Sequence, residues 1–271
     1  MFKIKRDTDS NITRHKAQLV AKGYVQRAGI DFDEVFASVA RLESVWFVLA
    51  IATHYGWTVH HLDVKSAFLN GDLVEEVYVE QPPGFISRGR EGKVYKLHKA
   101  LYGLCQAPRA WNAKLDSSLL SLGFRCSKEE HAVYVRGTSD DLLIVGVYVD
   151  DLVVVGANQA EVVKFKDEMA RIFNMSDLGP LHYYLGIEVS QSARGITLCQ
   201  STYAGKIIEK AGLAGCNSCN TPMEPHLKLS KASSNPLVDK TMYRSIVGSL
   251  RYLVHTCPDI AFAVGYVSRF M

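Results

Sequence analysis

Two adjacent carboxylates, Asp150 and Asp151, interrupt an otherwise apolar stretch, residues 142–157, which reads LLIVGVYVDDLVVVGA. Burying an unpaired carboxylate is costly, and two neighbouring carboxylates repel each other. One explanation is an exposed tight turn between two strands, because aspartate is a common turn residue. The other is a cation opposite the two side chains, since carboxylate oxygens are good ligands for Mg²⁺.

The flanking residues favour a hairpin. Residues 142–149 and 152–155 are near-continuous aliphatic runs, typical of buried strands, and two residues connect them. Tight hairpin turns usually contain glycine because their central residues need positive φ, and neither Asp150 nor Asp151 is glycine. The predicted turn is therefore strained. Metal binding by the two aspartates would be a functional reason for that strain, provided that another part of the chain supplies a third metal ligand.

Asp63 is the candidate third carboxylate. It ends an apolar strand in the segment HHLDVKSAFLNGDL, after which the chain turns at Asn70-Gly71. If this strand lies beside the 142–155 hairpin, the three aspartates come close together. Three carboxylates and substrate phosphates can hold two Mg²⁺ ions about 3.5–4 Å apart, the arrangement of two-metal phosphoryl transfer.

The rest of the chain must supply a fold that positions these carboxylates. Its 271 residues, 48% of them hydrophobic, are enough for one large globular domain or two smaller ones. The formal net charge of +3 is too small to indicate nucleic acid by itself. Basic residues are concentrated between Lys3 and Arg27, interleaved with Phe2 and Tyr24, and such a segment can follow a phosphate backbone. The alternative is a solvated β-hairpin face.

The cysteines predict reduced thiols in an intracellular protein. No secretory signal is visible, and Cys216–Cys219 is a C-x-x-C pair without further ligands, whereas structural zinc needs four. The apolar stretches are shorter than a transmembrane span, so no membrane partner is expected.

Hydrophobic periodicity predicts mixed helices and strands with no regular βαβ rhythm. Besides the two strands of the 142–155 hairpin, strands are predicted at five places: 1–27, 57–64, 75–85, 182–190 and 196–200. Helices are predicted where caps flank a helical pattern: 44–55, 108–122 and a segment that starts at Asn158. The tail from residue 201 is predicted to be mostly helical, and it stops in mid-pattern as if cut.

Four residues delimit these helices. Ser44 is the predicted N-cap of the first helix, and Gly56 follows its end. Pro108 occupies the first position of the second helix, as proline often does. Asn158 is the predicted N-cap of the third helix, with Glu161 three residues on in a variant capping box.

Six segments together resemble the reverse transcriptase of copia-type long-terminal-repeat retrotransposon polyproteins. In chain order they are RHKAQLVAKGYVQRAGIDFDEVF, HHLDVKSAFLNGDLVEEVYVEQPPGF, KALYGLCQAPRAW, VYVDDLVVVG, DLGPLHYYLGIEV and YRSIVGSLRYLVHTCPDIAFAV. The tetrad Tyr148-Val149-Asp150-Asp151 matches the polymerase signature of that family. The tetrad alone is a short motif, but all six segments in this order are highly specific, and the resemblance covers essentially the whole chain.

The resemblance implies an α+β, right-hand polymerase fold with an antiparallel palm sheet. Fingers and palm are expected in residues 1–198. A helical thumb- or connection-like region is expected in residues 199–271, truncated before ribonuclease H.

The resemblance also implies a catalytic centre. Asp63, Asp150 and Asp151 match the family's catalytic metal ligands, and the carbonyl of Val64 is a further oxygen ligand. The implied cofactors are two Mg²⁺ ions, or alternatively Mn²⁺.

Further positions match family residues that contact the substrates. Phe68 matches the aromatic gate that rejects a ribose 2′-hydroxyl, although a core aromatic is the alternative. Nucleotide contacts are implied for Tyr102 and Gly103. Lys16 and Lys22 are candidates for phosphate contacts, or else solvated lysines. Leu185 and Gly186 match the turn that grips the primer.

The implied activity is RNA-directed DNA polymerisation, in which deoxynucleotides are added to a primer by two-metal phosphoryl transfer. The implied partners are an RNA or DNA template with its primer, and deoxynucleoside triphosphates. The implied location is a cytoplasmic particle or the nucleus.

This sequence departs from the family at several positions that are usually basic, namely Gln18, Trp46, Cys105, Ser176 and Cys257. The lost charges matter in a protein that must bind polyanions. At position 18, where the family commonly has arginine, glutamine cannot supply the charge or the bidentate contacts of arginine. The three intact aspartates favour a competent polymerase. The lost charges and the truncation favour an inactive relic, and a host-adopted nucleic-acid-binding module that keeps the fold is the third alternative.

Overall fold

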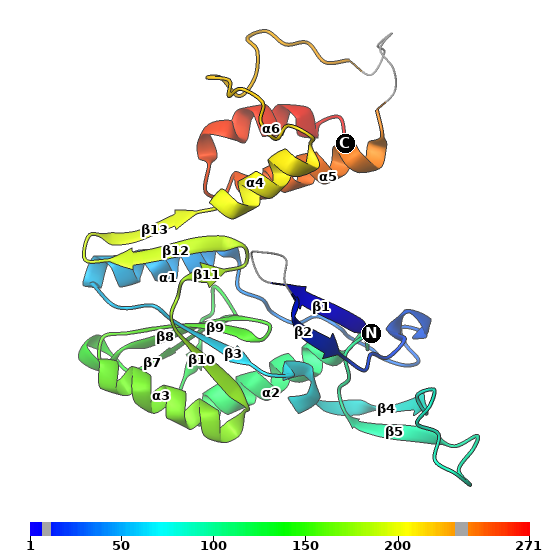
Figure 1. Cartoon of the computed structure of the whole chain (residues 1–271). Helices are drawn as coiled ribbons and strands as arrows, with labels where there is room; N and C mark the ends of the chain where they lie inside the picture. Colours follow the sequence, from blue (N-terminus) through cyan, green and yellow to red (C-terminus); the bar gives the residue numbers. More distant parts are fainter. Residues whose placement is uncertain (7–11, 231–237) are drawn as a thin grey trace. The chain divides into compact units, whose positions relative to one another are not determined.

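The computed structural model describes residues 1–6, 12–230 and 238–271, which divide into two compact units, Met1–Pro180 and Leu181–Met271. Figure 1 shows the elements of both units, which are described separately below. The predicted boundary after residue 198 concerns functional subdomains, which this division does not test. None of the helices in the described ranges is long and apolar enough to cross a membrane.

A six-stranded antiparallel sheet forms the centre of the first unit, in the order β10-β3-β9-β8-β7-β6 (Figure 1). Its strands are β3 (His60–Val64), β6 (Arg125–Cys126), β7 (Val133–Arg136), β8 (Leu143–Tyr148), β9 (Asp151–Gly156) and β10 (Met175–Pro180). Strands β8 and β9 form a hairpin, whereas β3 joins two strands that come much later in the chain. The sheet therefore depends on non-local pairing.

Helices cover both faces of this sheet (Figure 1). Helices α2 (Ala107–Ser121) and α3 (Gln159–Ile172) contact one face, and α1 (Leu42–Tyr55) contacts the other. The main core lies on the α2–α3 side, where Trp111 and Phe165 pack with apolar strand residues. Burial alternates along β3 in the same way. The side chains of Leu62 and Val64 point into this core and are buried, whereas those of His61 and Asp63 are half-exposed.

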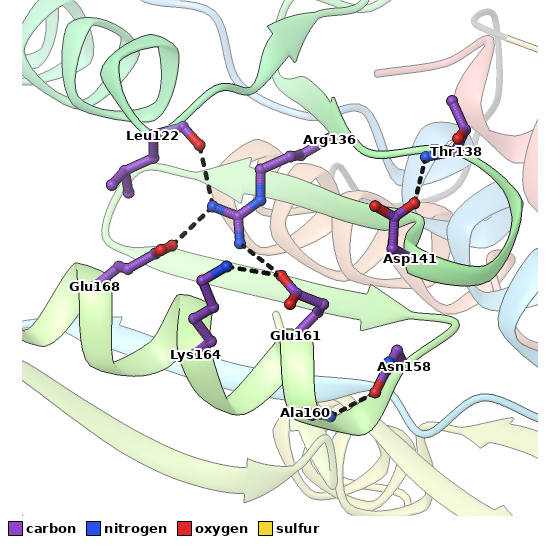
Figure 2. Close-up of polar contacts among 9 residues, drawn as sticks. All are labelled: Leu122, Arg136, Thr138, Asp141, Asn158, Ala160, Glu161, Lys164 and Glu168. Atoms are coloured by element: carbon purple, nitrogen blue, oxygen red, sulfur yellow. Dashed lines mark hydrogen bonds and ion pairs between the residues drawn. The ribbon is translucent and has the colours of Figure 1, made fainter.

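A half-buried arginine fixes α3 against β7 (Figure 2). Arg136 Nη1 donates to the carbonyl oxygen of Leu122 at 3.0 Å and to Glu168 Oε2 at 2.7 Å. Its other terminal nitrogen lies 3.7 Å from Glu161 Oε2, and its guanidinium stands over the Phe124 ring at 4.8 Å. Removing one partner of such a partly buried ion pair is usually destabilising, so this cluster holds the helix in register on the sheet.

Two hairpins and two short helices complete the parts of the first unit that matter for function. One hairpin joins β1 (Phe2–Arg6) to β2 (Ile12–Ala17), and the other joins β4 (Asp72–Glu80) to β5 (Val94–Lys99). Short 3-10 helices span Gly23–Val25 and Ala67–Asn70. Val77 on β4 and Leu104 before α2 belong to a second, smaller core.

Within its described residues, the second unit combines a three-stranded antiparallel sheet with three α-helices. The strands are β11 (Tyr183–Tyr184), β12 (Ile187–Ser192) and β13 (Gly195–Cys199). The helices are α4 (Ser201–Lys210), α5 (Lys240–Leu253) and α6 (Ala261–Ser268). Helix α5 begins after Asp239, whose carboxylate accepts hydrogen bonds from the first-turn amides. The helical tail is thus confirmed.

Most predicted helix ends are confirmed within two residues. Gly56 ends α1 in the left-handed conformation with φ of 69°, and Asn158 Oδ1 accepts a hydrogen bond from the Ala160 amide at 2.9 Å. Ser44 as N-cap is wrong, because α1 already begins at Leu42. The Ser44 hydroxyl instead donates to Glu130 Oε2 at 2.7 Å, a partner that is distant in sequence.

The mixed α and β composition and the antiparallel sheets agree with the expected fold class. Assignment of fingers, palm and thumb to these elements stays a prediction.

Candidate functional site

The turn of the β8–β9 hairpin lies one residue earlier than predicted. Tyr148 pairs with Asp151 across the hairpin, so the turn residues are Val149 and Asp150. Placing the turn at Asp150-Asp151 was wrong because the strand ladder continues through Asp151. Val149 has φ of 56°, whereas Asp150 is not among the residues with positive φ. Positive φ at the first position alone is typical of a type II′ turn, where glycine is usual.

Both carbonyl groups of this turn have hydrogen-bond donors from other elements. The indole Nε1 of Trp111, on α2, donates to the carbonyl oxygen of Val149 at 2.7 Å. The amide of Val64, at the end of β3, donates to the carbonyl oxygen of Asp150 at 2.8 Å. A β-branched residue with positive φ is strained, and such strain persists only where surrounding contacts hold the backbone.

Strand β3 places Asp63 directly opposite Asp151 on β9. Opposed residues of an antiparallel pair project their side chains from the same face of the sheet, so both carboxylates share one face. Ser176, on β10, is opposite Asp63 on the other side. Position 176, where the resemblance implies a basic residue, therefore lies next to Asp63 and carries no charge.

Asp151 already has a partner within the protein. His61 Nε2 lies 2.8 Å from Asp151 Oδ1, and His61 projects from the same face of β3 as Asp63, two residues later. The imidazole can therefore hold the Asp151 carboxylate in place. Asp150, one residue earlier, lies in the turn itself.

Asp63 and Asp150 both act on the hydroxyl of Tyr102. Burial raises the pKa of Tyr102, and the negative charges of Asp150 and Asp63 raise it further. The Phe68 ring packs on the Tyr102 ring with centroids 4.9 Å apart. Tyr102, predicted to contact the nucleotide, is thus within electrostatic reach of both carboxylates predicted to bind metal and in ring contact with Phe68.

Two glycines bring the N-terminal segment against this site. The Ala21 amide donates to the Tyr102 carbonyl oxygen at 2.7 Å. A Cβ on Gly103 would lie 2.2 Å from the Ala21 carbonyl oxygen, and one on Gly23 would lie 1.8 Å from the Gly103 carbonyl oxygen. Only glycine permits such close backbone contact. Lys22, between these contacts, is exposed beside the site.

The remaining predicted contacts stay predictions. Lys16 lies on β2 opposite Lys3, but its side chain is outside the described residues. Leu185 and Gly186 form the β11–β12 turn in the second unit, which is not placed relative to the first.

The donor set fits a hard divalent cation that keeps part of its coordination for substrate. Among the described residues, no group of three or more His, Cys, Asp or Glu side chains is placed to hold a metal ion alone. Mg²⁺ is usually bound by one or two carboxylates together with substrate phosphates, rather than by a complete protein cage. Asp63 and Asp150, which share the environment of Tyr102, match that requirement.

Sequence reasoning missed three supporting residues. Helical spacing in the 108–122 segment is consistent with packing of Trp111 on a helix face, but it carries no information about the indole N–H of Trp111. His61 was not singled out. Gln106 is 1% exposed, and its side chain donates to the Asp31 carbonyl oxygen and accepts from Gln26. The only sign of these buried contacts in the sequence was the presence of a glutamine, Gln106, in an apolar segment.

Comparison with known proteins identifies relatives along the whole chain. Residues 1–225 match the family model described as reverse transcriptase (RNA-dependent DNA polymerase). The chain is 41% identical over its full length to the retrovirus-related Pol polyproteins from transposon RE1 of Arabidopsis thaliana and from transposon TNT 1-94 of Nicotiana tabacum. It spans only 18% and 21% of those polyproteins. A putative transposon Ty5-1 protein of Saccharomyces cerevisiae is 37% identical over 78% of this chain and 69% of its own length.

Proposed function

The chain belongs to the reverse transcriptase family, and from that premise we propose that it is the polymerase domain of a copia-type retrotransposon polyprotein. It would add deoxynucleotides to a primer paired with an RNA or DNA template. The observation that carries this proposal is that β3 places Asp63 opposite Asp151 and its Val64 amide binds the Asp150 carbonyl, while the charges of Asp63 and Asp150 both reach Tyr102, whose ring packs on Phe68. Carboxylates next to an aromatic pair suit a metal-bound triphosphate whose sugar and base must be oriented.

Two divalent cations, when bound, would supply Lewis-acid chemistry to the primer 3′-hydroxyl, the α-phosphate and the departing pyrophosphate. Asp63 and Asp150 would bind them, with the Val64 carbonyl as a further oxygen. Asp151 would contribute its negative charge from a position held by His61. The strained turn would keep the Asp150 carboxylate at a fixed position relative to the sheet.

The aromatic pair would select the nucleotide. Phe68 would exclude a ribose 2′-hydroxyl by steric contact, and Tyr102 would support the Phe68 ring and border the base. The backbone contact between Gly23 and Gly103 holds Lys22 nearby, where its ammonium group would bind phosphate oxygens. Lys16 would contact phosphate, and Leu185 and Gly186 would bind the primer strand.

A second candidate is a nucleic-acid-binding relic without catalysis. Ser176 supports it, because this neutral residue faces Asp63 at a position that is usually basic in the family. The same fold would then bind primer and template without adding nucleotides.

Primer extension separates these two candidates. The purified chain is given a DNA primer on a defined RNA template with deoxynucleotides, in Mg²⁺ and in Mn²⁺, while primer–template binding is measured in parallel. A polymerase extends the primer, and Asp63→Asn abolishes extension while binding persists. A chain that binds nucleic acid but extends nothing in either metal is the relic, and the polymerase proposal then fails.

Sugar selection gives an independent test of the site. Phe68→Ala should admit ribonucleotides, because removal of the ring opens the space beside the sugar 2′ position. Phe47→Ala, on an exposed part of α1, is the matched control and should keep the wild-type discrimination. Unchanged discrimination in an active Phe68→Ala enzyme would assign Phe68 to packing alone.

A further inference from the structure

The Val149–Asp150 turn, of type II′, is related to the type I′ turn by rotation of one peptide. Type I′ and type II′ turns share positive φ at the first central residue and differ mainly by rotation of the central peptide. In type I′ the second central residue also has positive φ, which aspartate tolerates better than most residues. Rotation of the peptide between Val149 and Asp150 would therefore redirect the Asp150 side chain without breaking the hairpin.

Trp111 binds the oxygen of that peptide. Its indole Nε1 donates to the Val149 carbonyl oxygen at 2.7 Å, and the side chain is only 2% exposed. The ring is fixed by edge contact with Phe173 at 5.1 Å between centroids. A rotated peptide would point its carbonyl away from the indole, leaving a buried donor without its acceptor, which is costly.

The backbone of Trp111 is anchored to the segment that carries Asp63. A Cβ on Gly71 would lie 2.6 Å from the Trp111 amide nitrogen, so the chain after β3 and helix α2 touch backbone to backbone. The Val64 amide holds the other turn carbonyl, that of Asp150. Trp111 and β3 thus fix the turn relative to Asp63 from two directions.

We propose that Trp111 is a positioning residue for nucleotide addition, which fixes the central peptide of the turn and thereby the direction of the Asp150 carboxylate. This inference rests on the proposed polymerase function. A role in packing alone would require the size and shape of the ring, whereas the positioning role requires the indole N–H.

Trp111→Phe removes the N–H and keeps an aromatic ring. The expected result is a fall in kcat of about 10- to 100-fold, the usual effect of losing a group that orients a metal ligand, with KM for deoxynucleotide changed less than about threefold. Trp57→Phe is the matched control, because Trp57 stacks on Tyr55 outside the site. Leu115→Ala controls for core damage, since Leu115 lies on the same helix in the same core.

A double-mutant cycle separates positioning from packing. Val149→Gly relieves the backbone strain of the turn, because glycine adopts positive φ readily. If Trp111 acts through the turn, the fold loss caused by Trp111→Phe should differ between the Val149 and glycine backgrounds. Equal fold losses in both backgrounds would overturn the proposal.

Hydrogen exchange of the amides of residues 150–152 provides a readout that needs no catalysis. Trp111→Phe should raise their exchange at least about tenfold, whereas Leu115→Ala at equal stability should not. If the wild-type chain extends no primer but this exchange effect is present, the polymerase proposal fails and the positioning of the turn stands. A folded Trp111→Phe chain with unchanged turn exchange and unchanged kcat would overturn the inference.

If Trp111→Phe does not fold, 3-benzothienylalanine incorporated at position 111 replaces it. This tryptophan analogue keeps the bicyclic shape and lacks the N–H donor. The same changes in kcat and in turn exchange are expected, and their absence in the folded analogue protein would overturn the inference.

Discussion

The aspartate turn (Val149–Asp150) in the first unit and the leucine–glycine turn (Leu185–Gly186) in the second solve the same backbone problem differently. Each has a non-glycine residue first, with φ of 56° and 50°, respectively. In each, an aromatic side chain from a helix donates to the carbonyl of that first residue. The donors are the indole of Trp111 on α2 and the hydroxyl of Tyr252 on α5.

The two turns differ at their second residue, which is Gly186 in one and Asp150 in the other. Gly186 has φ of 88°, so the leucine–glycine turn has positive φ at both positions, typical of a type I′ hairpin turn that suits the twist of its strands. The aspartate turn has a β-branched residue first and a carboxylate second. Its own sequence therefore does not favour its conformation, which depends on donors from elsewhere. Strain of this kind is common at functional sites, where position matters more than stability.

The largest expected difference between the turns is in catalysis. Asp150→Asn should lower nucleotide addition at least about 100-fold, because a neutral amide cannot replace the anionic charge that binds Mg²⁺. Primer–template binding should persist or tighten, since a negative charge near phosphate is lost. Asp140→Asn, an exposed aspartate, is the control. Equal activity of Asp150→Asn and wild type would remove the functional distinction between the turns.

The next effect is on stability at the leucine–glycine turn. Gly186→Ala should cost about 1–2 kcal/mol in free energy of unfolding, because alanine is strained at this φ. The cost is conformational, since the nearest atom to a Cβ there is 3.7 Å away on Tyr252. Gly205→Ala, within helix α4, should instead stabilise by about 0.5–1 kcal/mol. Denaturant titration measures both, and changes of the same sign would contradict this account.

A smaller effect is expected from the Tyr252 hydroxyl. Tyr252→Phe should lower the free energy of unfolding by about 1 kcal/mol, the net value of one hydrogen bond. Single-turnover addition on a pre-bound primer should be unchanged, in contrast to Trp111→Phe. Tyr203→Phe, whose ring packs on the Tyr252 ring, is the control. A loss of addition rate equal to that of Trp111→Phe would show that both turns position the reacting groups.

The smallest expected effect is on the pH dependence of the stability of the central sheet, through His60 on β3. His60 is 7% exposed, and its pKa is lowered by burial and by the ammonium of Lys166, 3.0 Å from its Nδ1; contacts with Gln159 and Asp177 oppose this shift. Because the folded pKa lies below the unfolded value of about 6.5, the stabilisation is complete above pH 6.5 and is lost as the pH falls.

Unfolding of the first unit should therefore become easier by up to about 1 kcal/mol between pH 6.5 and 5.5. His60→Gln should reduce this dependence, whereas His54→Gln, an exposed position, should preserve it. Hydrogen exchange of both units at the two pH values is the measurement. An unchanged pH dependence in His60→Gln would assign it to other groups.

Local signals predicted the helices well. Gly56 ends a helix and Asn158 starts one because of their own conformational preferences, which require no distant partner. Ser44 was misassigned because its hydroxyl bonds to Glu130, a residue that helix periodicity cannot identify. The aspartate turn was placed one residue late, because the pairing of Tyr148 with Asp151 is set by the whole ladder.

The candidate site was predictable only in part. Motif order indicated the three aspartates and the aromatic pair, and the expected pairing of the Asp63 strand with the hairpin is confirmed. Trp111 and His61 were not predictable, because their partners, Val149 and Asp151, lie 38 and 90 residues later in the chain. Single-sequence patterns describe a residue's own face of a helix or strand, whereas these contacts arise when separate elements pack.

Because β3 lies between β9 and β10, Asp63 is synthesised on the ribosome long before either neighbouring strand exists. At about 5–20 residues per second, roughly 5–25 s separate the translation of β3 from that of β10. For most of this interval, until β9 has been made, the apolar face of β3, with Leu62 and Val64, has no sheet to join. The acidic centre is therefore among the last parts of the first unit to form, and a nascent chain stalled before Asp151 would expose β3 without completing the site.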